Sequence, residues 1–213
     1  MGVYVVFGVG IGNLGQHHRR PMTGWIAQLN RSLDQRSPTV EIIDSFGHTG
    51  NFLASSSSAD LKEVIASLDG ELATNWVVRP LNSVLTAVTA VSNECKPEAS
   101  DGIRWTPGLA FQVGAGIECK GVVTTPRAIL WQISPGTIGV WKRDILGKGN
   151  MLDRNRRGGG WGKISGDIEA QLGGRWTARS LRTVDGLLSK AKFKHLRNTG
   201  ASQDKGLLAE SVG

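Results

Sequence analysis

Basic side chains near the C-terminus are the residues of this chain with the clearest chemistry. Lys163 lies at the predicted start of a helix, and Arg179 lies on the predicted strand that follows it. An ammonium and a guanidinium group that face one point can bind a phosphate or a carboxylate, with help from helix-end amides. We therefore predict an anion site there, to which Arg175 and Arg182 also contribute. The alternative is a solvated basic face with no ligand.

The distribution of charge favours the same region. The 213 residues carry a net charge of +7, and residues 142–197 alone hold 14 Lys or Arg and five Asp or Glu, a local net charge of +9. Within this segment, residues 147–163 form a basic, glycine-rich loop. Clustered positive charge attracts phosphate backbones. Tryptophans lie among these bases, as stacking platforms for single-stranded nucleic acid do, although core tryptophans are the alternative: Trp141, Trp161 and Trp176.

A glycine motif follows the predicted strand at residues 3–7. The pattern G-x-G-x-x-G, typical of dinucleotide-binding loops, is formed by Gly10, Gly12 and Gly15. Two spacings argue against NAD. Pro21 places the helix start six residues after the motif, and Asp44 follows it by 29 residues, where about 20 is typical. We therefore predict a turn that needs glycine, and no cofactor.

Other reaction chemistry has little support in the sequence. Cys95 and Cys119 have neither metal-ligand spacing nor the density of a disulfide scaffold, and the four histidines form no ligand cluster, so we predict no metal. No G-x-S-x-G nucleophile motif is present. The runner-up function is a small-molecule enzyme with its site in a cleft between subdomains. Such a site would gather distant residues, for example His48, Asn51 and Arg179.

The order of elements predicts the fold of the N-terminal part. Apolar runs predict strands at 3–7, 39–44, 52–54 and 75–79. Helical spacing predicts one helix at 21–35 and another over Leu61 to Leu68 with Ser57 as its N-cap. The resulting β-α-β-β-α-β order is that of a ferredoxin-like fold, with an antiparallel sheet and helices on one face. The short turn between the second and third strands leaves no room for a Rossmann crossover.

The remaining residues predict a second α+β unit. The turn-rich segment 92–102 separates subdomains at 1–92 and 103–193, and a flexible tail covers 194–213. The second unit is predicted to contain strands at 109–113, 128–133, 137–141 and 175–181, a helix over Ile164 to Leu172 and a last helix capped by Thr183. No apolar run approaches the roughly 20 residues that span a bilayer, which predicts a cytoplasmic protein.

Four segments resemble the domain of unknown function 1697 family. They are N-L-G…P-M at 13–22, T-G-N-F-L at 49–53, G-K-I at 162–164 and T-A-R-S-L-R-T-V at 177–184. They are similar, in order and spacing, to the family motifs R-G-I-N-V-G-G…P-M, S-G-N-V-V, G-R-S-K-L and T-T-R-N-W-x-T-V. The resemblance covers residues 10–190 and identifies a divergent member, with Ser180-Leu181 in place of Asn-Trp. It implies two subdomains with ferredoxin-like character, and it does not indicate whether the protein catalyses a reaction.

The sequence thus predicts a binding protein for an anionic ligand, either a phosphate-containing small molecule or single-stranded nucleic acid, with the basic C-terminal half as its surface. The prediction has a geometric test. If Asn13, Asn51, Lys163 and Arg179 converge on one concave site, a ligand site is favoured. If they are scattered, diffuse electrostatic binding of nucleic acid is favoured.

Overall fold

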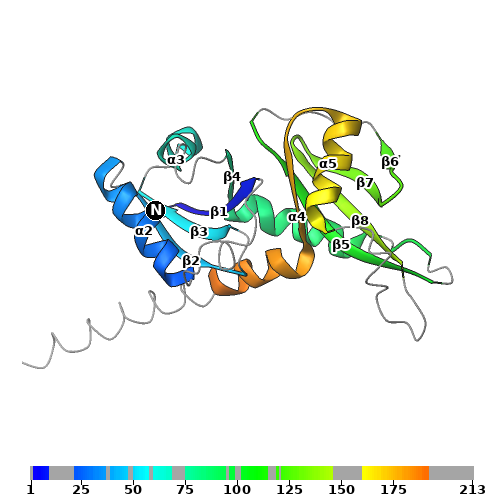
Figure 1. The fold of residues 1–213 in the computed structure, drawn as a ribbon, viewed down its shortest axis with the longest axis horizontal. Helices are drawn as coiled ribbons and strands as arrows, with labels where there is room; N and C mark the ends of the chain where they lie inside the picture. The colour runs from blue at the N-terminus through cyan, green and yellow to red at the C-terminus, as the bar shows by residue number, and fades with distance from the viewer. Residues whose placement is uncertain are drawn as a thin grey trace, which may run out of the picture.

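The computed structural model of the chain describes residues 2–9, 22–36, 39–47, 50–57, 60–68, 75–94, 96–98, 102–114, 119, 121–145 and 160–191. Two antiparallel sheets lie side by side in it, each accompanied by helices (Figure 1). The protein is therefore a mixed α+β structure, as the sequence predicts.

The N-terminal sheet has the strand order β2-β3-β1-β4, and all its neighbours are antiparallel. Its strands are β1 (Gly2–Val9), β2 (Val40–Ser45), β3 (Asn51–Ser56) and β4 (Asn75–Pro80). Helix α2 (Met22–Arg36) lies between β1 and β2 in the chain, and α3 (Leu61–Leu68) lies between β3 and β4. In each β-α-β unit, the two strands are separated in the sheet by one strand of the other unit. This split order confirms the predicted ferredoxin-like arrangement.

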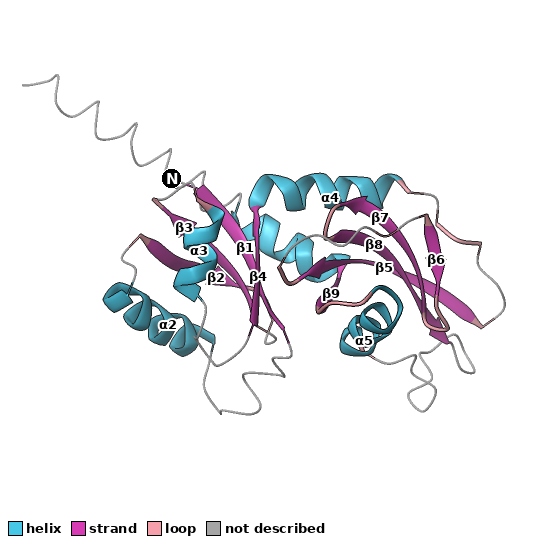
Figure 2. Cartoon of the chain, turned by 90° about the horizontal axis from the view of Figure 1, so that it is seen from above, coloured by secondary structure: helices cyan, strands magenta, loops and turns pink. Residues whose placement is uncertain are grey.

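Helices α2 and α3 cover one face of this sheet (Figure 2). Alternate residues of β1, Tyr4 and Val6, pack there against Leu29 and Leu33 of α2 and Val64 of α3. These five side chains are at most 5% exposed, and burying a large apolar side chain contributes roughly 1.5–3 kcal/mol. The apolar residues that recur every second position in β1 and about every 3.6 positions in the helices therefore lie on the faces that pack against each other.

The C-terminal sheet has the order β6-β7-β8-β5-β9, again with antiparallel neighbours. Its strands are β5 (Ile103–Gln112), β6 (Val122–Thr124), β7 (Ala128–Ser134), β8 (Thr137–Ile145) and β9 (Trp176–Ser180). Strand β5 begins six residues before the predicted strand at 109–113, and the short strand β6 has no counterpart in the prediction. The first half of β5 is difficult to predict from the sequence because it contains Pro107, and proline weakens a strand assignment.

Helix α5 (Trp161–Leu172) covers one face of the C-terminal sheet. Ile164 and Ile168 pack on it, and the Ser165 hydroxyl oxygen accepts the backbone N–H of Ala178 at 2.9 Å. The first turn of α5 lies over Gly108 of β5. The ring of Trp161 approaches this glycine so closely that a β-carbon there would collide with it. The N-terminus of α5 is thereby fixed above the middle of β5.

The other faces of the two sheets share one apolar core. Helix α4 (Leu81–Asn93) and a helix at 181–191 pack into it. At its centre, the rings of Phe7 on β1 and Phe111 on β5 stack with centroids 4.9 Å apart. Helix α4, although it belongs to the predicted unit 1–92, contacts strands of both sheets. Figure 2 shows α4 and α5 on opposite sides of the C-terminal sheet.

Two predicted helix caps are wrong by three residues each. Helix α3 begins at Leu61, and its first turn is capped by Asp60, whose carboxylate accepts the N–H of Lys62 at 2.8 Å; Ser57 is not the cap. The last helix begins at residue 181, and Ser180 accepts the N–H of Thr183 at 3.2 Å, so the predicted cap is the donor. Both errors arise because several adjacent residues can serve as caps. Among the described residues, no helix is long and apolar enough to cross a membrane.

Candidate functional site

Arg179 and Asn51, two of the predicted site residues, do meet. They lie on β9 and β3, and the Arg179 Nε donates to Asn51 Oδ1 at 2.6 Å. The same guanidinium donates through Nη2 to the carbonyl of Gly8 at 2.7 Å and through Nη1 to Thr177 Oγ1 at 2.5 Å. It also lies 5.7 Å from the ring centroid of Phe7. The contact therefore joins the two sheets through protein acceptors.

This junction is buried, which changes the interpretation of Arg179. Asn51 is 1% exposed, and burial lowers the pKa of Arg179 to about 10, so the group stays charged at neutral pH. Arg79 of β4 makes the reciprocal connection, since its Nη2 donates to the carbonyl of Gln112 on β5 at 2.8 Å. Burial lowers the pKa of Arg79 as well. The two arginines act as cross-links between the sheets.

Lys163 and Arg179 cannot face one ligand, contrary to the prediction. Helix α5 covers the sheet face to which Ala178 contributes, and successive side chains of a strand point to opposite faces. The side chain of Arg179 therefore lies on the other face, toward β1 and β3. Lys163 is exposed on the first turn of α5.

The remaining predicted residues are dispersed. Arg175 is exposed just before β9, at the end of that strand away from the start of α5, and Arg182 is exposed in the first turn of the helix at 181–191. Asn13 lies outside the described residues, as do His48, Cys95 and the glycine motif at 10–15. The described part of the predicted anion site is thus one buried pair and three separate cations.

An apolar core occupies much of the junction in which the enzyme alternative would place its cleft. Phe7, Phe111 and apolar side chains of α4 and the helix at 181–191 fill the part of it that the structure describes. Within the described ranges, no group of three or more His, Cys, Asp or Glu side chains is placed to hold a metal ion. Burial raises the pKa of Cys119, which makes this thiol a poor nucleophile.

A second polar cluster lies on the α5 face of the C-terminal sheet. Lys142 and Asp144 alternate on β8 and form a buried ion pair. Asp144 also accepts the hydroxyl of Thr106 at 2.5 Å, and Arg104 lies 4.0 Å from the same carboxylate oxygen. The antiparallel register of β5 and β8 explains the cluster, since Arg104 pairs with Asp144 and Thr106 pairs with Lys142. Two cations therefore share one carboxylate at this end of the sheet.

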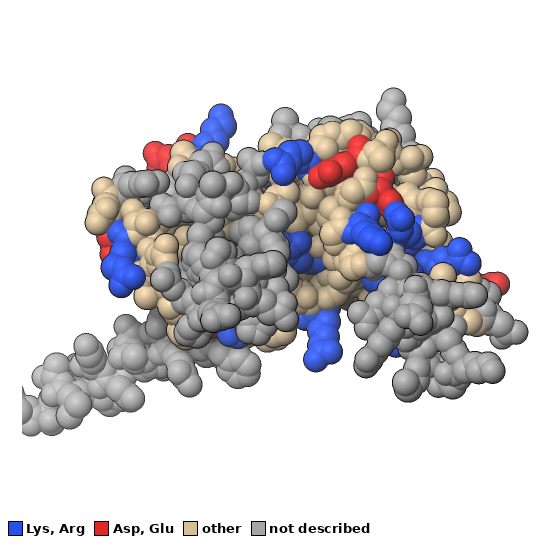
Figure 3. Space-filling model, in the orientation of Figure 1, with Lys and Arg blue, Asp and Glu red and all other residues tan. Residues whose placement is uncertain are grey.

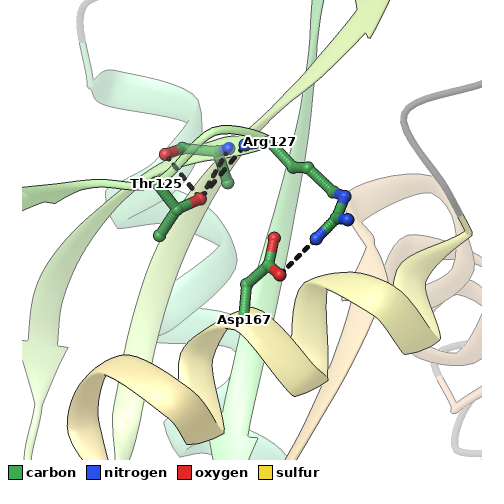
Figure 4. Close-up of polar contacts among 4 residues, drawn as sticks. Thr125, Arg127 and Asp167 are labelled. Carbon is green, nitrogen blue, oxygen red and sulfur yellow. Dashed lines mark hydrogen bonds and ion pairs between the residues drawn. The ribbon is translucent and has the colours of Figure 1, made fainter.

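An ion pair on α5 lies beside this cluster. Arg127, in the turn between β6 and β7, pairs with Asp167 of α5, and the turn itself is held by Thr125 (Figure 4). The Thr125 hydroxyl oxygen accepts the backbone N–H of Ala128 at 2.9 Å. Lys163 lies four residues before Asp167, which places both on one side of α5.

We call the set Arg104, Arg127, Lys142 and Lys163, with Asp144 and Asp167, the basic face. On the C-terminal half, Figure 3 shows Lys and Arg side chains gathered beside Asp and Glu on the side that carries α5. Three of the four bases were not among the predicted site residues. The polar residues at 104 and 106, and those at 142 and 144, alternate visibly in the sequence. The pairing of β5 with β8, which brings the two sets together, does not follow from the sequence pattern.

The tryptophans among the bases are mainly core residues. Trp176 is 1% exposed, and its indole N–H donates to the carbonyl of Gly173 at 2.8 Å. Trp141 is 7% exposed, and Trp161 is half-buried over Gly108. Trp141 and Trp176 therefore present no open stacking surface, and for these two the core explanation from the sequence is the one observed.

No family model, curated protein or solved structure matches the chain. Membership of the domain of unknown function 1697 family therefore stays a prediction, and the site has to be argued from this chain alone.

Proposed function

We propose that the protein binds a phosphate-bearing anionic ligand through the basic face, and that it does so in the cytoplasm. The observation that carries the proposal is the pairing of charges there. Both carboxylates of the face already pair with a base, Asp144 with Lys142 and Asp167 with Arg127. The half-exposed Arg104 and the exposed Lys163 therefore add positive charge that no further carboxylate of the face balances.

Neighbouring features support the same proposal. Helix α5 begins above the middle of β5, and its N-terminus has no side-chain cap, so its dipole adds to the positive potential of the face. In the sequence, residues 148–157 contain four further bases and one acid. Long-range attraction of phosphates follows from such a concentration of charge, and it weakens with salt because counterions screen it.

The experiment compares two charge-reversal variants that change the net charge equally. Arg104→Glu with Lys163→Glu alters the basic face, whereas Arg31→Glu with Lys62→Glu alters exposed bases of the N-terminal half. Affinity is measured by fluorescence anisotropy for a labelled single-stranded oligonucleotide over a range of salt concentrations, with inorganic pyrophosphate as competitor. We expect binding to weaken in the first variant only, and the slope of log K against log salt to fall by about two.

The outcomes separate the ligand classes. Competition by pyrophosphate at millimolar concentration supports a small phosphate ligand, and binding that only a polymer such as heparin displaces supports a nucleic acid. Equal weakening in both variants would show that net charge alone governs binding. That result, or a failure of the unaltered protein to bind any of these probes at low salt, would overturn the proposal.

A further inference from the structure

The C-terminal sheet carries two unusual donors on the face opposite α5. They are the indole N–H of Trp141 and the Nε–H of Arg143, which lie two residues apart on β8 and so point to the same side of the sheet. Both nitrogen atoms are buried and have no hydrogen-bond acceptor in the part of the chain that the structure describes. Trp141 as a whole is 7% exposed.

Such donors are rare because they are costly. A buried donor left without an acceptor costs roughly 1–3 kcal/mol, and more when it belongs to a charged group. Two of them, one on a guanidinium, lie on neighbouring positions of one strand face. An acceptor that serves both would remove the cost at a single point.

The surroundings of the pair show what kind of acceptor fits. Trp131 stacks on Trp141 with ring centroids 6.2 Å apart, and Trp105, the register partner of Arg143, donates its indole N–H to the carbonyl of Glu98 at 3.2 Å. Asp144 lies on the opposite face of β8, so the strand supplies no carboxylate to this side. The donors are thus flanked by aromatic rings and face no acid of their own sheet.

We propose that Trp141 and Arg143 bind a small oxyanion, a carboxylate or an inorganic phosphate, between them. Residues two apart on a strand are roughly 7 Å apart at their Cα atoms. The two oxygen atoms of one oxyanion can accept from donors at that spacing, and hydrogen bonds from a guanidinium to an oxyanion are short and strong. This site is independent of the basic face, because the two lie on opposite sides of the C-terminal sheet.

The test follows the indole N–H signals of the ¹⁵N-labelled protein by NMR. The Trp141→Phe variant identifies the Trp141 signal, and the protein is titrated with sodium phosphate and, separately, with sodium acetate against sodium chloride at equal ionic strength. We expect a saturable shift of the Trp141 signal and of the Arg143 Nε–H signal. The Trp176 signal serves as the internal control, since its N–H is already bonded to Gly173, and should not move. The anion that saturates at lower concentration identifies the chemistry.

Variants separate binding from other causes. In Arg143→Gln the Trp141 shift should require at least about tenfold more anion, because the charged donor is lost. In Trp141→Phe, which keeps an aromatic ring, the Arg143 signal should still shift but with weaker affinity, so the test survives if Arg143→Gln does not fold. Arg104→Glu with Lys163→Glu should leave the titration unchanged even if the proposed function fails. Three results would overturn the proposal. The first is a Trp141 signal that shifts with neither anion, and the second is a Trp141 signal that shifts at the same anion concentration in Arg143→Gln. The third result is a Trp141 signal that moves in Glu98→Gln without added anion.

Discussion

Replacing Arg179 by methionine should destabilise the protein severely, because the side chain joins the two sheets. Four hydrogen bonds from this charged group, to Asn51, Thr177, Ala178 and Gly8, together contribute on the order of 6–12 kcal/mol. Burial of the charge, which lowers its pKa to about 10, costs about 3 kcal/mol. The hydrogen bonds therefore outweigh the burial. Since methionine refills part of the space, we expect Arg179→Met to lower the free energy of unfolding by about 3–5 kcal/mol.

The assay is urea unfolding followed by tryptophan fluorescence, with Arg175→Met as the matched control. Arg175 is an exposed arginine next to the same strand, so its replacement should change the free energy of unfolding by less than about 0.5 kcal/mol. Asn51→Ala combined with Arg179→Met should be less destabilising than the sum of the two single variants by at least about 1 kcal/mol, because the two side chains share a hydrogen bond. A loss below about 1 kcal/mol in Arg179→Met, or full additivity with Asn51→Ala, would refute the reasoning.

The same residue predicts a pH dependence. The folded pKa of Arg179 is about 10, which is lower than that of the same group in the unfolded chain, so both states carry the charge below about pH 9. The difference in unfolding free energy between the unaltered protein and Arg179→Met should therefore be constant from pH 6 to 9. Between the two pKa values the unfolded chain binds more protons, so the contribution of this group to stability rises with pH. A difference that changes by more than about 1 kcal/mol below pH 9 would contradict the assignment.

Two further predictions concern the close packing at Gly186 and the burial of Cys119. Gly186→Ala should destabilise the protein by about 1–3 kcal/mol in the urea assay, because a β-carbon would strike the ring of Phe46. The control Gly166→Ala, on an open side of α5, should stabilise the protein by about 0.5–1 kcal/mol. Destabilisation by both substitutions would show that helix context, and not the Phe46 contact, determines the effect. In a Cys95→Ser background, Cys119 should react with a thiol reagent at pH 8 at least about tenfold more slowly in the folded than in the urea-unfolded protein, because burial raises its pKa. As its folded pKa is raised, the stability that Cys119 contributes should fall once the pH passes the unfolded value near 8.5, and equal reaction rates would contradict the burial.

The sequence predicts the N-terminal sheet well because its signals are local. Each strand and helix of the β-α-β-β-α-β unit has its own apolar period, and the turn between β2 and β3 fixes their pairing. The C-terminal sheet depends on pairing between distant segments. Strand β5 lies between β8 and β9, whose partner residues are about 30–70 positions away, and no local pattern specifies that neighbour.

Lys163 and Arg179 lie apart in the structure for a related reason. Lys163 and Arg179 are close in sequence, but α5 packs on the face of Trp176 and Ala178, and the alternation of β9 directs Arg179 away from it. The apolar residues at 176 and 178 do indicate which face a helix covers. They do not indicate that the polar face is buried as well, because that burial depends on β1 and β3 from the other half of the chain.

The shared core between the sheets has a consequence for how the chain folds during synthesis. Val5, Phe7 and Val77 of the N-terminal sheet are covered in part by Val184 and Leu187, which are made more than 100 residues later. At about 5–20 residues per second, the ribosome needs roughly 5–20 s to deliver them after β4 is complete. During that time the finished sheet has one face closed by α2 and α3 and the other only partly closed by α4. We expect this nascent intermediate to be the form of the chain most in need of a chaperone.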